Sequence, residues 1–300
     1  MDGVLLIDKP SGPTSHDVVA RMRSVTGERS IGHTGTLDPM ATGLLPLVLG
    51  KATRLSAYLT GGDKTYDATI RLGFFTETDD ALGARLDSPA GQPPLPDEAT
   101  VVAVLERFRG TFDQVPPSHS AKKVGGKKAY DMARMDTPLA LEAVSVTLSA
   151  LEFAGYEGDT VRLQITATAG FYVRALARDL GAALGCGAHL AALRRTRAGV
   201  FDVAQAIPMA DAERLGPEVA NYLLSPANAL SDLSSVIVTP LGLKRALHGN
   251  PLNPGHLAGH VVPTAGSSGN RPVRVLDADG QLVALAQSRG GALHPAVVLG

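Results

Sequence analysis

Tryptophan is absent from this 300-residue sequence, and aromatic residues make up only 4% of it. The single cysteine, Cys186, excludes an internal disulfide bond and a zinc site built from several thiolates. The longest apolar stretches, residues 44–49 and 188–193, fall well short of the roughly 18 residues that cross a bilayer. The first residues show neither a basic segment nor a cleavage site, so we expect no secretory signal, no membrane partner and a cytoplasmic location.

Charge is present in almost equal amounts of both signs, with 28 Lys and Arg against 29 Asp and Glu, and 44% of the residues are hydrophobic. This is enough apolar material for one large domain and a small one. Basic residues concentrate at 107–134 and 162–197, whereas acidic residues concentrate at 77–98. Two positive regions on a nearly neutral protein suit a polyanion bound in one groove. Two solvated helix faces are the alternative interpretation.

The hydrophobic pattern mixes both kinds of secondary structure. Residues 64–72 alternate as a strand with one buried face, and Val18, Val19 and Met22 share one face of a helix entered through residues 13–15. We expect strands at residues 4–7, 64–72, 143–153 and 160–168, a connection at 155–159, and helices at 15–24 and 175–184. Because no βαβ repeat is visible, the pattern predicts an α+β fold with a mixed, largely antiparallel sheet.

The last part of the chain differs in composition from the rest. Residues 235–300 are rich in Gly, Pro, Val and Leu, and their strand-like pieces at 273–276 and 282–286 flank an Asp279-Gly280 turn. We therefore expect two domains, residues 1–234 and a small β-rich module at 235–300.

Residues 32–43, with the sequence GHTGTLDPMATG, contain the only carboxylate between Glu28 and Asp63. This carboxylate is Asp38, which precedes Pro39 on a glycine-rich segment with apolar residues after it. An isolated carboxylate in such surroundings suits a nucleophile or a general base. The alternative is a helix N-cap with Pro39 in the first helical position.

A second candidate site is the segment 170–174, with the sequence GFYVR, between a predicted strand and a predicted helix. Side chains at such junctions project from the end of a sheet, where binding sites are common. Tyr172 and Arg174 together can stack on a base and bind a carboxylate or a phosphate. A buried tyrosine beside a surface arginine is the alternative.

Other motifs are weak. Gly126-Lys127 lacks the remaining residues of a P-loop, and no dinucleotide-binding glycine motif opens a helix. The carboxylates at 77–80 are expected to form a solvated acidic loop. Cys186, near His189, is expected to be a buried small residue rather than a nucleophile. The scattered histidines argue against a metal site.

Several motifs in order resemble the bacterial tRNA pseudouridine-55 synthases, a family of pseudouridine synthases, over about residues 3–205. Residues 32–43 resemble the catalytic motif of this family. The other matching segments are residues 8–15, 63–66 with 71–73, 76–79, 116–123 with 126–130, 170–174 and 185–195. Phe171 and Ser118-His119 depart from the usual pattern without touching the proposed chemistry.

The resemblance implies a cofactor-free, metal-free isomerase that converts uridine 55 in the T loop of tRNA to pseudouridine. It implies an α+β pseudouridine-synthase fold with an RNA-binding cleft and, more weakly, a PUA-like RNA-binding module at the C-terminus. Asp38 would attack C6 of the base or C1′ of the ribose, two possibilities that stay open. Arg174 would keep Asp38 ionised.

The resemblance also assigns further residues. Tyr66 would stack on the uracil, Tyr172 would assist removal of the C5 proton, and His33 would take the place of the flipped base. Leu193 would line the apolar wall of the pocket. The other residues expected to bind the substrate are Lys9, Lys64, Lys122, Lys123, Lys127 and Arg194, and both basic regions are expected to contact phosphates. We expect the T arm of tRNA as the partner and a monomeric chain.

Three alternatives remain to be weighed against an isomerase. A non-catalytic RNA-binding protein on the same fold would keep its function when Asp38 is changed to Asn. A uridine methyltransferase needs a methyl-donor site and a cysteine nucleophile, for which this sequence offers no motif. A glycosidase would need a second carboxylate about 5–10 Å from Asp38.

Overall fold

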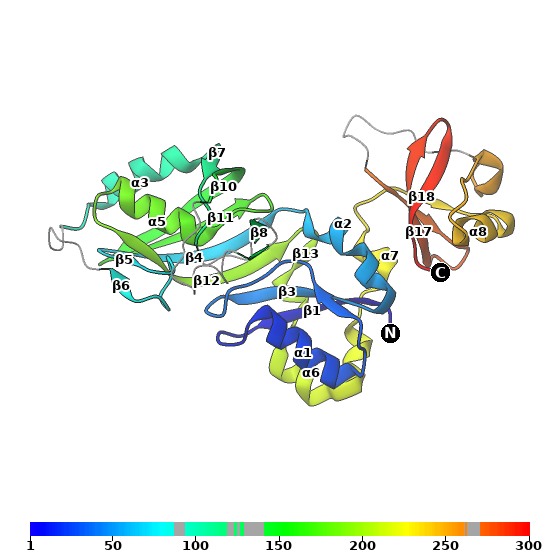
Figure 1. Ribbon diagram of the computed structural model, residues 1–300, viewed down its shortest axis with the longest axis horizontal. Coiled ribbons are helices and arrows are strands. Elements are labelled where there is room, and N and C mark those ends of the chain that lie inside the picture. Colours follow the sequence, from blue (N-terminus) through cyan, green and yellow to red (C-terminus); the bar gives the residue numbers. More distant parts are fainter. Residues whose placement is uncertain (87–93, 119–122, 125–126, 129–140, 261, 263–270) are drawn as a thin grey trace.

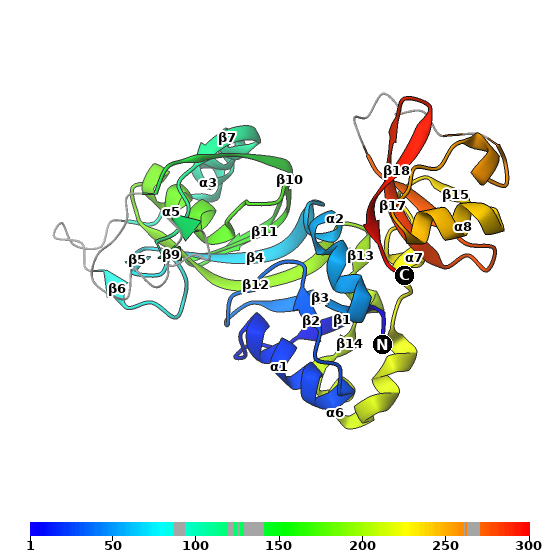
Figure 2. The same cartoon turned by 45° about the vertical axis from the view of Figure 1, so that its right-hand side comes forward.

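The computed structural model describes residues 1–86, 94–118, 123–124, 127–128, 141–260, 262 and 271–300. One large sheet runs through the main body of the molecule, and a smaller sheet with its own helix forms the C-terminal part beside it (Figure 1). The view in Figure 2 shows that α1 (Ser15–Thr26) and α6 (Met209–Leu215) lie together along one side of the main body. No helix among the described residues is long and apolar enough to cross a membrane.

The large sheet is mixed, as the sequence predicts. In spatial order its strands are β14 (Ile207–Pro208), β1 (Gly3–Lys9), β3 (Thr42–Leu49), β12 (Ala188–Ala198), β4 (Lys64–Leu72), β11 (Thr160–Ala167), β10 (Val144–Glu157) and β7 (Gly110–Gln114). Two more strands attach to it, β2 (Ile31–His33) on β3 and β13 (Phe201–Asp202) on β12. Within the described part of this sheet, β1–β14 and β3–β12 are parallel pairs and the other pairs are antiparallel. The α+β prediction is therefore confirmed.

Helices accompany both the large sheet and the C-terminal part (Figure 1). Among the described residues the α-helices are α1 (Ser15–Thr26), α2 (Ser56–Thr60), α3 (Glu98–Leu105), α5 (Val173–Ala183), α6 (Met209–Leu215), α7 (Pro226–Ala229) and α8 (Pro240–Leu247). Two short antiparallel pairs lie outside the large sheet, β5 (Phe75–Thr76) with β6 (Arg85–Leu86), and β8 (Lys123–Val124) with β9 (Lys127–Lys128).

Local sequence explains the best-predicted elements. In β4 every second residue is buried, so one face of the strand contributes Tyr66 and Ile70 to the core. Helix α1 begins at a capping box in which the side chain of Thr14 and that of Asp17 each bind the other's backbone N–H. It ends at Gly27, whose φ of 71° lies in the left-handed region that favours glycine.

The connection between β10 and β11 differs from the prediction. Strand β10 continues to Glu157, so the turn is only Gly158-Asp159, and the loop expected at 155–159 is wrong. Gly155 lies within the strand at a shift in the pairing register. A glycine inside a strand commonly marks such a bulge, and this one was mistaken for a turn residue.

The middle of the sheet depends on a close contact between β3 and β12. Gly43 has a φ of 97°, and a Cβ atom there would lie 2.3 Å from the carbonyl oxygen of Arg195. Only glycine fits between these two backbones. This parallel pairing places the segment before β3, which contains Asp38, beside the second half of β12.

The C-terminal sheet has the order β15 (Ser235–Ile237), β16 (Val273–Leu276), β17 (Leu282–Arg289) and β18 (Ala292–Val298), and the predicted hairpin between β16 and β17 is confirmed. It has a core of its own around Val275 and Leu293. However, Leu282, Leu285 and Leu299 pack into a second cluster with residues of β1, β3 and α2. The division at residue 234 stays a prediction, because this shared cluster joins both parts.

Candidate active site

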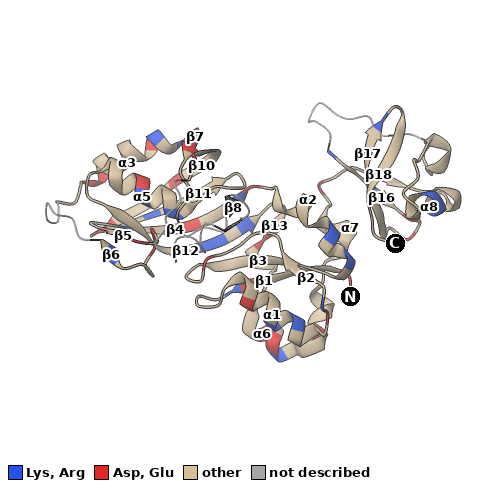
Figure 3. Cartoon of the chain, viewed as in Figure 1, with Lys and Arg blue, Asp and Glu red and all other residues tan. Residues whose placement is uncertain are grey.

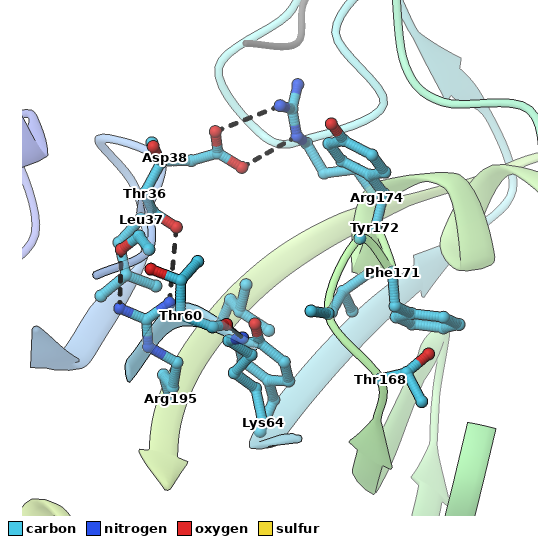
Figure 4. Close-up of a pocket in the computed structure, with 16 residues that line it drawn as sticks. Thr36, Leu37, Asp38, Thr60, Lys64, Thr168, Phe171, Tyr172, Arg174 and Arg195 are labelled. Atoms are coloured by element: carbon cyan, nitrogen blue, oxygen red, sulfur yellow. Dashed lines mark hydrogen bonds and ion pairs between the residues drawn. The ribbon is translucent and has the colours of Figure 1, made fainter. Parts of the chain in front are cut away.

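A cavity of about 260 Å³ opens where the segment before β3, strand β4, strand β12 and the start of α5 meet (Figure 4). Four residues that the sequence analysis singled out as catalytic line it together. These are Asp38, Tyr66, Tyr172 and Arg174. Its size is close to the lower end of small-ligand pockets, about 300 Å³, and suits one nucleotide unit.

The backbone around Asp38 is fixed by contacts from the N-terminal segment. The hydroxyl of Ser15, at the start of α1, accepts a hydrogen bond from Leu37 N at 2.8 Å and donates one to Leu37 O at 3.1 Å. Asp38 O accepts a bond from Ala41 N at 3.1 Å, which closes a turn that leads directly into β3. Because no helix follows Asp38, the N-cap interpretation is wrong.

Arg174 binds both carboxylate oxygens of Asp38. Its Nε lies 2.9 Å from Oδ2, and its Nη2 donates to Oδ1 at 3.1 Å (Figure 4). The guanidinium is buried at 6% side-chain exposure, whereas the carboxylate keeps 31% and faces the cavity. Burial raises the pKa of Asp38, Arg174 opposes this, and the nearby Asp80 adds to the increase. A two-point charge-assisted pair of this kind favours the ionised carboxylate and fixes its direction.

The acidic segment after β5 also belongs to the site. The side chain of Asp80 is 6% exposed and lies 3.8 Å from Arg174 Nη1. Its Oδ1 accepts bonds from Thr78 Oγ1 at 2.6 Å and from Leu82 N at 3.0 Å. Arg174 in turn donates to Thr78 O at 3.0 Å. The prediction of a solvated acidic loop is therefore wrong for Asp79 and Asp80, which face arginines distant in sequence, whereas Glu77 is exposed as expected.

Tyr172 is positioned through its main chain rather than its side chain. The buried amide of Gln114, at the end of β7, accepts from Tyr172 N at 2.8 Å and donates to Tyr172 O at 3.1 Å. Helix α5 starts at the next residue, so Tyr172 and Arg174 project into the cavity from one junction. Tyr66 and Leu193, which are largely buried, also belong to the lining of the cavity.

Lys9 is not placed to contact a substrate, contrary to the prediction. It is fully buried, and its Nζ donates to the carbonyl oxygens of Pro10, Pro13 and Pro39 at 2.9, 2.8 and 3.3 Å. Burial lowers the pKa of Lys9 to about 8, with Asp38 opposing. Its role in the structure is to tie the segment after β1 to the turn that contains Asp38.

Sequence reasoning missed Arg195 as a site residue. It is 1% exposed, and its guanidinium donates to the carbonyl oxygens of Leu44, Gly35 and Thr36 at 2.7, 3.0 and 3.4 Å (Figure 4). Burial lowers the pKa of Arg195, and the hydroxyl of Tyr66 opposes this. The available signal was its spacing, because Arg195 lies two residues after Leu193 and therefore shares its face of β12.

Lys64 lines the cavity but directs its Nζ to the protein. It donates to Thr60 O at 2.5 Å and to Gly62 O at 2.7 Å. Burial lowers the pKa of Lys64, and the neighbouring Arg195 acts in the same direction. Lys64 thereby fixes the connection from α2 to β4 at the edge of the cavity.

Of the other predicted substrate-binding residues, His33 and Arg194 are not among the residues that line the cavity. His33 lies edge-on to His16 with ring centroids 5.5 Å apart, and burial lowers the pKa of His33. Arg194 forms a two-point pair with Asp8, at 2.7 and 3.0 Å. Lys122 lies outside the described residues. Lys123 and Lys127 belong to β8 and β9, and their side chains are outside the description.

The described residues contain neither a cluster of metal ligands nor an exposed thiol. Among the described residues, no group of three His, Cys, Asp or Glu side chains is arranged to bind a metal ion. Cys186 is buried, as expected, and burial raises the pKa of its thiol.

Comparison with known proteins agrees with this geometry. Residues 23–173 match the TruB family pseudouridylate synthase N-terminal domain, and residues 174–226 match the tRNA pseudouridylate synthase B C-terminal domain. The tRNA pseudouridine synthase B of Thermobifida fusca is 42% identical, over 99% of this chain and 98% of its own. That of Burkholderia mallei is also 42% identical, over 98% and 96%.

Solved structures resemble the whole chain. An H/ACA ribonucleoprotein bound to a substrate RNA containing 2′-deoxyuridine gives a TM-score of 0.74 at 26% identity, over 99% of this chain and 85% of that chain. A Cbf5–Nop10–Gar1 complex gives the same TM-score at 27% identity and the same coverage. The predicted fold class is confirmed by these neighbours.

Proposed function

The chain belongs to the TruB family of pseudouridine synthases and isomerises uridine in tRNA to pseudouridine, and we propose that its target is uridine 55 of the T arm, with Asp38 as the nucleophile. The observation that supports this role is the two-point pair between Asp38 and Arg174 on the wall of a cavity that also contains Tyr66. A carboxylate, a fixed cation and an aromatic ring around one nucleotide-sized space are the groups that this isomerisation needs.

In the proposed reaction the carboxylate of Asp38 forms a bond to C6 of the uracil or to C1′ of the ribose. The glycosidic C1′–N1 bond breaks, the base turns, and C5 forms the new bond to C1′. The C5 proton then leaves, N1 gains a proton, and Asp38 is released unchanged. Tyr172, on the same wall of the cavity, is the group proposed to assist departure of the C5 proton.

Asp38 attacks only in its ionised form, so its environment must favour the anion at neutral pH. Burial raises the pKa of this carboxyl, and the paired guanidinium of Arg174 opposes the increase. We propose that Asp80 acts indirectly. By accepting bonds from Thr78 and Leu82 while facing Arg174, it fixes the orientation in which Arg174 reaches Asp38.

The target base must leave its stack to reach the cavity. Flipping costs a few kcal/mol, which stacking on an aromatic ring and hydrogen bonding in the pocket offset. Tyr66 is proposed to supply the ring, with Leu193 as apolar wall. His33, at the end of β2 outside the cavity, is proposed to occupy the space that the flipped base leaves in the T loop.

The RNA is proposed to lie across the arginine-bearing strand β12. Figure 3 shows basic ribbon segments along this strand. Arg194 and Arg197 are half-exposed or exposed there and suit phosphate contacts, whereas Arg174 and Arg195 are buried and bind protein groups. The prediction that the whole basic region 162–197 contacts phosphates is therefore corrected to its exposed members. The C-terminal module is proposed as a second RNA contact of a monomeric chain in the cytoplasm.

Tritium release from uridine labelled at C5, placed in a T-arm hairpin, tests the proposal directly. We expect release by the wild type and a loss of about 10⁴-fold or more in the Asp38→Asn variant, because the amide is not a nucleophile. Binding of the hairpin should persist in that variant. Tight binding without release by the wild type would leave only an RNA-binding protein, and equal release by both proteins would exclude Asp38 as the nucleophile.

A further inference from the structure

Helix α5 directs a second arginine toward the acidic segment, one helical turn after Arg174. The guanidinium of Arg178 binds three different acceptors. Its Nη1 donates to Asp79 Oδ2 at 3.1 Å, its Nη2 donates to Val115 O at 2.8 Å, and its Nε donates to Asp179 Oδ1 at 2.9 Å. Positions i and i+4 of a helix lie on one face, so Arg174 and Arg178 reach adjacent residues of the same loop.

Through its contact with Asp79, Arg178 is linked to the proposed nucleophile Asp38 by a short chain of contacts. Asp79 is adjacent to Asp80, which faces Arg174, and Arg174 binds Asp38. Asp79 O also accepts a hydrogen bond from Leu190 N at 3.0 Å, so this residue is held by α5 on one side and β12 on the other. A shift of Asp79 would therefore shift Asp80.

Asp79 needs such support because its backbone is in an uncommon conformation. Its φ is 60°, and among the described residues other than glycine only His260 shares a positive φ. Its carboxylate is 14% exposed and pairs with Arg178. Burial raises the pKa of Asp79, and Arg178 opposes this. Removing the guanidinium would leave a mostly buried carboxylate next to a strained backbone.

The contact with Val115 lies beside the residue that supports Tyr172. Val115 directly follows Gln114, whose side-chain amide binds both main-chain groups of Tyr172. One guanidinium thus touches the residue next to each of the two supports, Asp80 for Arg174 and Gln114 for Tyr172. Arg178 itself is not among the residues that line the cavity.

We propose that Arg178 is a positioning residue for pseudouridine formation, joining the loop of Asp79 to the end of β7 so that Arg174 and Tyr172 keep their places around the target uridine. This rests on the proposed function of the cavity and adds a residue that does not touch the substrate. A surface ion pair would explain a single contact with a carboxylate. It does not explain a guanidinium that binds two carboxylates and a main-chain carbonyl at once.

The test uses the full chain with three variants, Arg178→Met, Arg178→Lys and Asp79→Asn. Methionine and lysine keep the apolar stem and the helix propensity, so α5 should persist. We measure the single-turnover rate constant of tritium release at saturating hairpin and the dissociation constant of the same hairpin. Arg178→Met should lower the rate about 10- to 100-fold, the loss expected from a misplacement of about 1 Å, while binding changes less than about twofold.

Partial rescue and non-additivity separate positioning from a general loss of structure. Arg178→Lys should recover part of the rate, because an ammonium can bind Asp79 or Val115 but cannot reproduce the fork. The double variant with Arg178→Met and Asp79→Asn should lose no more of the single-turnover rate than Arg178→Met alone, because both substitutions break the same contact between Arg178 and Asp79. A double variant whose loss equals the product of the two single losses would overturn the proposal.

The matched control is Arg214→Met, which removes an exposed arginine paired with Asp211 on α6, and it should retain the wild-type rate. If Arg178→Met does not fold, Asp79→Asn, which preserves shape, still tests the rate. A rate within twofold of wild type in both Arg178→Met and Asp79→Asn would overturn the inference while leaving the proposed function intact. Absence of release by the wild type would overturn the proposed function itself.

Discussion

The side-chain amide of Gln114 forms two hydrogen bonds with the main chain of Tyr172, accepting one from its N–H and donating one to its carbonyl oxygen. Gln114 is 1% exposed, so water does not compete for this contact in the folded protein. Strand β7 lies at the edge of the large sheet, and this contact ties it to the start of α5.

Replacing Gln114 with Leu should therefore destabilise the protein by about 1–3 kcal/mol, the cost of leaving buried polar groups unpaired. Activity should fall as well, because Tyr172 loses its anchor. Urea unfolding measures the first effect and single-turnover kinetics the second. Gln164→Leu, which removes an exposed hydrogen bond to Asp67, is the control and should cost less. Equal destabilisation by both changes would show that the Tyr172 contact is unimportant.

Changing Arg174 to Lys should lower the rate about 100-fold or more, because one ammonium cannot bind both oxygens of Asp38. The pH dependence should change too. Burial raises the pKa of Asp38 and Arg174 opposes this, so weakening the cation raises that pKa further. Since only the ionised carboxylate attacks, the acidic limb of the rate profile should move to higher pH.

The measurement is the single-turnover rate as a function of pH for the wild type and Arg174→Lys. Arg21→Lys, an exposed change in the pair with Glu213, should leave both the rate and the profile as in the wild type. An acidic limb that stays in place, or moves to lower pH, in Arg174→Lys would contradict the role given to this guanidinium.

Because of Lys9, the free energy of unfolding should depend on pH in the alkaline range. Its pKa is lowered from 10.5 to about 8, chiefly by burial. Between these two values the unfolded chain binds a proton that the folded chain has released, so the free energy of unfolding rises with pH there. The stability of the wild type relative to Lys9→Met should therefore increase as the pH rises from about 8 toward 10. Urea unfolding at several pH values measures this difference.

Lys9→Met should also be less stable than the wild type near neutral pH, because three carbonyl oxygens lose their shared donor. Lys51→Met, which removes an exposed lysine, is the matched control. Parallel stability curves for the wild type and Lys9→Met across this alkaline range would refute the assignment.

Gly43→Ala should destabilise the fold by about 2 kcal/mol or more, since the new Cβ would meet the backbone of Arg195 and the φ is positive. Gly199→Ala provides the control. Gly199 also has a positive φ, of 58°, but nothing lies within 4 Å of the position of its Cβ. It should cost only about 1–2 kcal/mol of backbone strain. The difference between the two variants, measured by thermal unfolding, isolates the close approach of β3 and β12.

The predictions that were confirmed rest on short-range patterns in the sequence. The alternation in β4 and the capping residues of α1 act within a few positions of the chain, so composition and spacing suffice to find them. The isolation of Asp38 from other carboxylates in sequence made it a candidate site residue, and in the structure it lines the cavity. Its resemblance to a known motif assigned the role that spacing alone left open.

Failures arose where the partner lies far away in sequence. The resemblance placed Lys9 among the residues that bind the substrate, yet its Nζ donates to three carbonyl groups of the protein. Asp80 was assigned to solvent because its neighbour Arg174 comes 94 positions later. Sequence patterns show which residues are charged, but only the folded chain shows which charges meet.

The apolar cluster that Leu282, Leu285 and Leu299 share with β1 and β3 makes the C-terminal sheet more than an appended module. Cutting the chain after residue 234 would remove Leu282, Leu285 and Leu299 from the apolar cluster that also contains Leu44 and Leu55, both fully buried in the intact protein. A shortened chain would therefore expose apolar surface and be prone to self-association. For the intact chain, we expect the shared cluster to couple the unfolding of the two sheets.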